Sequence, residues 1–318
     1  MLPLRRKSRT LRVLVVALAA ALVWMVQGSA HAAPADGDPP APGRQLLFFN
    51  HAYGVLDRET ADAIEHSAYL RDFANFQVRT TTGSDGQTWT GRYLMGRETY
   101  VELFGTGDLP GRDGEFGAGG MGVSVERAGD LATARQRLVD LGVTPADFLQ
   151  TRDFGDGVPV PWFDGFFAIA ADQYDSFGAW SMEYRPEYFA DPRSKTEPAS
   201  HPGDVGRERY LSDDYRKHLM RDVTSVRIAA TPRDVDSTVP LLRAGGFDVR
   251  SLPGGGAVAL RGGTTIRFDA TPREDAGLRE ITFSLNRPVA HRHEERIGRS
   301  TLTVGPGAGA KWAFDRAR

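Results

Sequence analysis

The chain has 318 residues, with 39 basic and 41 acidic side chains, 36 glycines, 19 prolines and no cysteine. This balance makes nucleic acid and anionic membrane surfaces poor partners, and the lack of thiols excludes disulfides, so packed cores must provide the stability. The Gly and Pro content is typical of many short strands joined by turns.

Residues 1–32 have the pattern of a secretory signal peptide. A cationic start precedes an apolar run at 13–26, and Ala30-His31-Ala32 is typical of a cleavage site. Residues 33–44 predict a flexible leader. We therefore expect a secreted protein that has no membrane association after cleavage near Ala32; a retained N-terminal anchor is the alternative. The mature part keeps 34 basic against 41 acidic residues, a balance of −7, and is long enough for two domains.

The first folded segment predicts a βαβββ module. A strand is expected at 46–56, followed by a helix for which Asp57 is the N-cap residue. Three further strands are expected at 76–82, 88–95 and 99–104, the first two joined by the turn residues Gly83-Ser84-Asp85-Gly86.

The same order of elements recurs three times. Helices are expected at 130–141, ending before Gly142, and after Thr231, where Pro232 occupies the first helical position. The fourth copy has no convincing helix. The further strands are expected at 121–126, 161–170, 179–184, 226–230, 247–252, 257–260, 265–269, 280–285, 300–304 and 311–314.

Four modules in pairs predict an α+β fold of two tandem domains with curved mixed sheets. The domains are expected at 45–190 and 224–318. Residues 191–223 would join them through a Pro- and Ser-rich stretch and an amphipathic bridging helix at 205–220.

One histidine and two glutamates occupy comparable places in the two modules of the first domain. His51 lies on an apolar first strand, and Glu102 and Glu183 lie near the ends of apolar last strands. A buried charge there is costly without a partner. Strand alternation is consistent with both carboxylates pointing into the curved sheet, so the pattern indicates a metal site.

Paired βαβββ modules with His51 on the first strand and Glu102 on the fourth resemble the vicinal oxygen chelate superfamily of glyoxalases, extradiol dioxygenases and bleomycin-resistance proteins. The stretches Phe49-Asn50-His51, Trp89-Thr90-Gly91 and Glu102-Leu103-Phe104 are also similar to an uncharacterised exported bacterial branch. The resemblance implies that His51, Glu102 and Glu183 bind a divalent metal (Mn, Fe, Ni or Zn). The superfamily often has a second histidine where this chain has Gly120-Met121-Gly122.

The resemblance implies an exported, metal-dependent enzyme that acts on a small oxygen-bearing substrate as a lyase, isomerase or dioxygenase, with Glu102 or Glu183 as base. The alternative is a non-catalytic protein that sequesters a small molecule in the same cleft. Structural ion pairs and a hydrogen-bonded core histidine would explain the same residues without a metal. In the second domain, Ser225 and Arg267 stand where His51 and Glu102 would be, so that domain is expected to be structural or to cover the first.

Other features have simpler interpretations. His291 and His293 are expected in a solvated loop, and the Gly-rich stretches at 117–120 and 254–256 are expected to be turns. The aromatic residues of 162–167 could line a ligand cleft or belong to the core. The sequence does not predict an oligomeric state.

Overall fold

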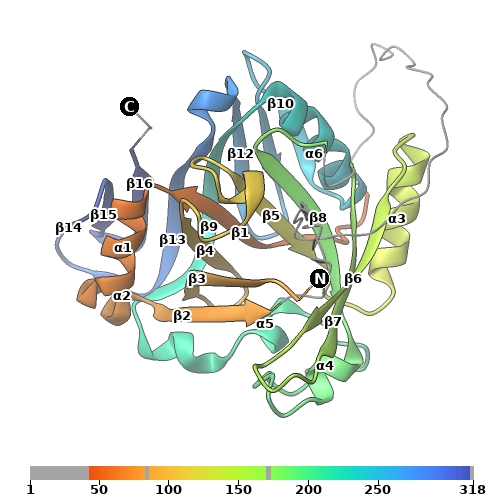
Figure 1. The fold of residues 1–318 in the computed structure, drawn as a ribbon, viewed down its shortest axis with the longest axis horizontal. Coiled ribbons are helices and arrows are strands. Elements are labelled where there is room, and N and C mark those ends of the chain that lie inside the picture. The colour runs from red at the N-terminus through yellow and green to blue at the C-terminus, as the bar shows by residue number, and fades with distance from the viewer. Residues whose placement is uncertain (1–42, 83–85, 170–172, 316–318) are drawn as a thin grey trace, which may run out of the picture.

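The computed structural model describes residues 43–82, 86–169 and 173–315, which form two eight-stranded mixed sheets (Figure 1). The predicted signal peptide, most of the leader and the turn residues 83–85 lie outside the described residues. No helix among the described residues is long and apolar enough to cross a membrane.

The first sheet has the order β2-β3-β4-β1-β5-β8-β7-β6. The pairs β1/β4 and β5/β8 are parallel, and β1 meets β5 antiparallel at the centre, so two βαβββ modules lie side by side. This confirms the predicted α+β class and the paired modules. The strands are β1 Phe48–Leu56, β2 Asn75–Thr82, β3 Thr88–Met95, β4 Tyr100–Gly105, β5 Gly119–Ser124, β6 Ala146–Arg152, β7 Val160–Phe167 and β8 Phe177–Tyr184.

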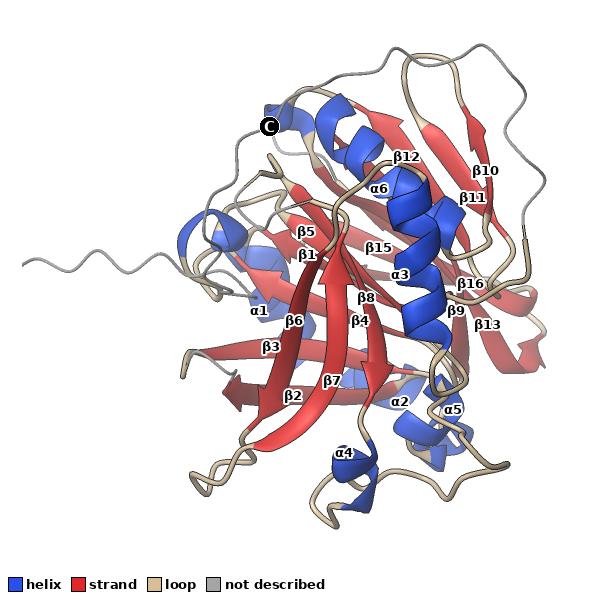
Figure 2. Cartoon of the chain, turned by 90° about the vertical axis from the view of Figure 1, so that its right-hand side faces the viewer, coloured by secondary structure: helices blue, strands red, loops and turns tan. Residues whose placement is uncertain are grey.

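The first sheet curls until its two edges meet. A bridge between Thr82 and Asp153 joins the end of β2 to the residue that follows β6. Figure 2 shows the consequence, with β6, β7 and β8 running steeply across the direction of β2 and β3. The inner face of the sheet therefore encloses a space.

The second sheet repeats this order as β10-β11-β12-β9-β13-β16-β15-β14. No helix separates β13 from β14, as the sequence predicts for the fourth copy. The strands are β9 Met220–Ala230, β10 Asp248–Ser251, β11 Ala257–Leu260, β12 Thr265–Ala270, β13 Gly277–Val289, β14 His293–Ile297, β15 Ser300–Val304 and β16 Gly307–Phe314.

The main helices begin at the residues that the sequence indicates, and α3 ends before Gly142, but the first expected helix is divided at Ser67 into α1 and α2. The Asp57 carboxylate accepts from the Thr60 amide at 2.9 Å, the Thr231 hydroxyl accepts from the Asp234 amide at 3.2 Å, and Gly142 follows α3 with φ 79°. The helices are α1 Arg58–His66, α2 Ala68–Phe73, α3 Asp130–Asp140, α4 Pro186–Ala190, α5 Arg207–Tyr210 and α6 Pro232–Ala244, with short 3₁₀ turns at Gly111–Gly114 (η1), Asp213–Lys217 (η2) and Arg273–Asp275 (η3).

One hydrophobic core serves both sheets. Helix α6 packs against α3 and β8, β13 contacts β1, and α1 contacts β14. Fully buried side chains from both halves, including Leu47, Leu103, Leu241, Ile281 and Trp312, belong to the core. The helix-covered faces of the two sheets therefore pack against each other and form this core. The inner face of the first sheet points away from it.

Three details differ from the sequence-based expectations. The bridging helix at 205–220 is wrong: that stretch contains only the single turn α5 and the 3₁₀ turn η2, and Met220 already begins β9. Its apolar residues are buried by contacts with the first domain rather than by one helix face. Strands β6 and β14 were not expected, and His293 begins β14 instead of lying in a loop.

Candidate functional site

The curled first sheet encloses a cavity lined mainly by aromatic side chains, which we call the aromatic cavity. It measures about 1030 Å³ with its open mouth included, but the centre of a water molecule can reach only about 70 Å³ of it, so the space is narrow. A small molecule fits such a space better than a bulky one. Its aromatic residues are Tyr53, Trp89, Tyr93, Tyr100, Phe104, Phe148, Trp162, Phe163, Phe167, Tyr174, Trp180, Tyr184 and Tyr210.

Strand alternation determines which residues reach the aromatic cavity. On β4, Tyr100, Glu102 and Phe104 line the cavity, whereas Val101 and Leu103 face the shared core. At 162–167, Phe163 and Phe167 follow this alternation and line the cavity, and Phe166 is part of the core; Trp162 also lines the cavity, at the point where the β6/β7 register shifts. Some aromatic residues of this stretch therefore line a cleft, and others belong to the core.

His51 is buried on β1 and lines the aromatic cavity. Its ring stacks on Tyr100, with centroids 4.4 Å apart, and meets Trp180 edge-on at 5.3 Å. The Nδ1 atom lies 2.9 Å from Oδ1 of Asn50, whose amide group donates to Ser124 and Tyr184. Since that amide oxygen accepts, the His51 proton is on Nδ1 and the Nε2 lone pair is available. Burial lowers the His51 pKa to about 3, so the ring is neutral.

Glu102 is the carboxyl group of the aromatic cavity. It is partly buried in the cavity wall, and it forms no ion pair with any side chain among the residues the structure describes. This burial raises the Glu102 pKa to about 8, and the opposing fields of Arg79 and Arg152 only reduce the shift. The group is therefore mostly protonated at neutral pH and can act as a hydrogen-bond donor.

Two arginines that the sequence did not single out also line the aromatic cavity. Arg79 lies on β2 and Arg152 on β6, the two edge strands that approach each other at the bridge between Thr82 and Asp153. The sequence contains one indication of the position of Arg79: Gln77, Arg79 and Thr81 alternate along β2 and so share one polar face of that strand.

The structure does not bring Glu183 together with His51 and Glu102. Its carboxylate lies on the opposite face of the sheet, where it accepts from the backbone amides of Gly129 and Leu131 at 2.9 and 3.2 Å. Those amides stand at the beginning of α3, so Glu183 caps a helix. The inward positions of β8 belong to Trp180 and Met182. The expectation that Glu183 points into the curved sheet is therefore wrong, because neighbouring residues of a strand point to opposite faces and Glu183 lies between two inward positions.

This placement does not fit a metal centre with three protein ligands. His51 and Glu102 provide two donor groups, and no group of three or more His, Cys, Asp or Glu that could hold a metal is present in the described part of the chain. The catalytic and metal-binding roles expected for Glu183 are therefore not supported by its position.

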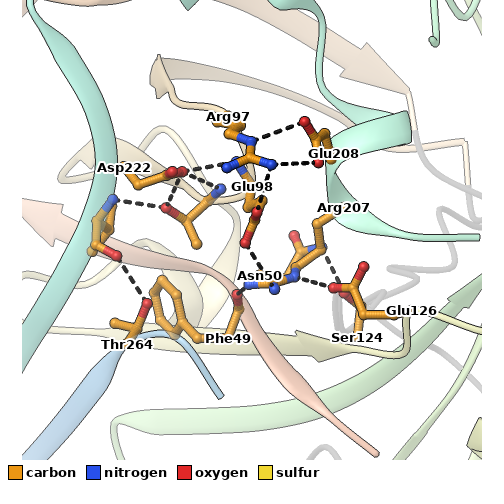
Figure 3. A network of polar contacts seen from close by, with 12 residues as sticks. Phe49, Asn50, Arg97, Glu98, Ser124, Glu126, Arg207, Glu208, Asp222 and Thr264 are labelled. Atoms are coloured by element: carbon orange, nitrogen blue, oxygen red, sulfur yellow. Dashed lines mark hydrogen bonds and ion pairs between the residues drawn. The ribbon is translucent and has the colours of Figure 1, made fainter. Parts of the chain in front are cut away.

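The segment that joins the two domains contributes Tyr210 to the wall of the aromatic cavity and is held in place by Arg207. Tyr210 of this segment stacks on Tyr184 inside the cavity, with centroids 4.2 Å apart. The guanidinium of Arg207 binds Glu98 at 3.2 Å and Glu126 at 2.5 Å, and it donates to the Phe49 carbonyl oxygen at 2.6 Å. Figure 3 shows these contacts. Arg207 itself is almost fully buried.

The second sheet has no equivalent constellation. Its register places Ser225 where His51 stands and Arg267 where Glu102 stands, as the sequence comparison predicts. Arg227 and Arg267 both bind Asp269 on an exposed face. Ion-paired surface residues thus occupy the positions that form the cavity in the first domain.

Comparison with known proteins gives a family without an assigned reaction. A profile described as "Family of unknown function (DUF5829)" matches residues 49–314. No curated protein matches the sequence significantly.

Solved structures resemble the chain at low sequence identity, and three of them illustrate this. A hypothetical protein from Staphylococcus aureus is 10% identical with a TM-score of 0.49, covering 82% of this chain and 100% of that one. The Mn(II)-bound glyoxalase from Novosphingobium aromaticivorans is 11% identical with a TM-score of 0.40, covering 86% and 84%. A variant of homoprotocatechuate 2,3-dioxygenase from B. fuscum, in complex with HPCA, is 13% identical with a TM-score of 0.36, covering 73% of this chain and 55% of that one.

The chain thus spans about half the length of that dioxygenase. At these scores the likenesses carry no argument about a reaction. The architecture of vicinal oxygen chelate type follows instead from the chain's own strand order, with paired βαβββ modules meeting at β1 and β5.

Proposed function

The chain belongs to this family of unknown function (DUF5829), and from the aromatic cavity we propose that it binds a small, flat organic molecule inside the first domain. The observation that supports this is the wall of thirteen aromatic side chains around a narrow space that opens to solvent. Pockets with mainly apolar walls and a few polar groups are the usual sites for small ligands. The polar groups here include His51, Glu102, Arg79 and Arg152.

Tryptophan fluorescence tests the binding proposal, because Trp89, Trp162 and Trp180 line the cavity. We expect naphthalene derivatives to quench or shift this emission saturably. Gly178 also lines the cavity, and a Cβ atom there would meet only the Tyr174 ring, at 3.6 Å. Gly178→Leu should therefore fill the cavity and abolish binding while the protein stays folded.

Gly309→Leu is the matched control, since a Cβ atom at this strand glycine of the second domain would meet nothing closer than 3.9 Å. It should leave binding unchanged. Equal binding by the parent protein and by folded Gly178→Leu would reject the aromatic cavity as the site.

A second candidate function is acid–base catalysis on the bound molecule. It is favoured by one observation: a carboxyl group with a pKa of about 8 and a neutral imidazole with an available Nε2 line the same cavity. Glu102 would donate a proton and His51 Nε2 would accept one. The expected signature is loss of turnover with retained binding in Glu102→Gln. If Glu102→Gln retains both turnover and binding, Glu102 is not the catalytic acid and binding remains the proposed function.

Export and metal dependence need their own measurements. The signal-like residues 1–32 support export, and finding the mature protein outside the cell would test it. With two donor groups at hand, we expect ligand binding to survive EDTA. A requirement for stoichiometric metal would contradict a cavity that works through its own side chains.

A further inference from the structure

We propose that the ligand of the aromatic cavity carries an anionic group, such as a carboxylate, which Arg79 and Arg152 bind. This inference rests on the proposed binding function and specifies the chemical class of the ligand: a small aromatic acid. It starts from the position of the two guanidinium groups, which come from the two edge strands β2 and β6 and line the same cavity.

Neither arginine forms an ion pair with a carboxylate of the described residues. The two arginines that are most deeply buried in the described part of the chain do: Arg92 binds Glu65 and Asp108, each at 2.6 Å, and Arg207 binds Glu98 and Glu126 at 3.2 and 2.5 Å. Arg79 and Arg152 are partly buried, and a partly buried guanidinium group without a counter-ion is costly. An anionic ligand in the cavity would supply the counter-ion that they lack.

The contacts that the two arginines do make orient them without neutralising them. Arg79 donates through Nε to Gln77 at 2.6 Å and lies 5.4 Å from the centroid of the Tyr93 ring. Arg152 donates through Nη1 to the Tyr188 hydroxyl at 2.7 Å and lies 5.4 Å from the centroid of the Trp162 ring. Each guanidinium has five N–H donors, so most of them remain for a ligand. A planar carboxylate matches this geometry.

Glu102 does not provide the missing counter-charge. It lies in the field of both arginines but forms an ion pair with neither. With this carboxyl protonated at neutral pH, the cavity contains two positive charges and no negative one. An aromatic acid is complementary to both parts of the cavity. Its flat apolar ring can stack on the aromatic walls, and its negative charge can pair with the two guanidinium groups.

The test compares two probes of the same shape, naphthalene-2-carboxylate and naphthalene-2-carboxamide, by titration calorimetry at pH 7. We expect the carboxylate to bind at least 10-fold more tightly than the carboxamide. Arg79→Gln and Arg152→Gln should each weaken carboxylate binding by about 10- to 100-fold, the usual value of a charge-assisted hydrogen bond. Carboxamide binding should change by less than about 3-fold.

Arg227→Gln is the control, because this arginine of the second domain is exposed and already paired with Asp269. It should change nothing. Arg79→Lys should recover part of the carboxylate affinity, which a purely structural role would not predict.

The outcomes separate the two proposals. If the carboxylate and the carboxamide bind with equal affinity and Gly178→Leu abolishes the binding of both, the proposal of an anionic ligand is wrong but the proposed binding function is retained. Folded arginine variants that lose both probes alike also overturn it, since the arginines would then only shape the cavity. If neither probe binds, the proposed function fails as well.

Discussion

Replacing Glu102 by Gln should make the protein more stable at alkaline pH. The Glu102 pKa is about 8 in the folded protein and 4.5 in an ordinary environment. Because the folded-state pKa is raised, the proton bound by Glu102 stabilises the fold fully below pH 4.5, and this contribution is lost as the pH rises through 8. Gln keeps the shape of the protonated acid and never ionises, so it avoids that loss.

The size of the effect follows from the shift. A difference of about 3.5 pKa units corresponds to about 4.8 kcal/mol when the group is fully ionised. Water that enters the cavity screens part of this electrostatic cost. We therefore expect the free energy of unfolding of Glu102→Gln to be about 3–5 kcal/mol higher than that of the parent at pH 9, and to agree with it within about 1 kcal/mol at pH 5.

Urea unfolding followed by tryptophan fluorescence at pH 5, 7 and 9 measures this difference. Subtracting parent from variant at each pH removes the contribution of other titrating groups. Glu183→Gln is the control, because it removes a helix cap on the other face of the sheet. It should cost about 1 kcal/mol and give no gain at pH 9. A Glu102→Gln variant that is never more stable than the parent would refute the burial of this carboxyl group.

Three further predictions concern the walls and the mouth of the aromatic cavity. Arg207→Met should lower the free energy of unfolding by about 3 kcal/mol, because it leaves two carboxylates without their buried partner. Arg97→Met is the control: its ion pair is more exposed, so it should cost at most about 1 kcal/mol in the same urea assay. Gly122→Ala should cost about 1–3 kcal/mol and weaken naphthalene binding, since its Cβ atom would lie 2.7 Å from Cε1 of His51; unchanged affinity would contradict that contact. Affinity for naphthalene-2-carboxylate should fall as the pH rises through about 8, when Glu102 ionises, and Glu102→Gln should remove this dependence in calorimetry.

Local sequence signals predicted most of the fold. Cap residues such as Asp57 and Thr231 determine helix starts through short-range hydrogen bonds, which a sequence pattern contains. The stretch at 205–220 shows the limit of this reasoning. Tyr210 and Leu211 are buried against the first domain, and contacts between segments distant in the chain decide the conformation there.

The candidate site was predicted only in part for a similar reason. Alternation on β4 and β8 assigns residues to two faces but does not say which face is enclosed. On β4 the face with Glu102 is inward, whereas on β8 the face with Glu183 is outward, because Trp180 and Met182 fill the cavity side. Arg79 and Arg152 lie on edge strands, and they share one cavity only because the sheet curls. Curling depends on the pairing of distant strands, which the sequence pattern does not contain.

The shared core has a consequence for how the protein can be divided. Helix α6 of the second domain covers β8 and α3, and β13 covers β1, so the strands that bear His51 and Trp180 are supported from behind by the other half of the chain. The two domains should then unfold in a single cooperative transition. The second domain, which has no cavity residues of its own at the corresponding positions, packs against the back of the first sheet. A fragment ending before residue 220 would expose that backing surface, and it would lose the ligand site together with the fold.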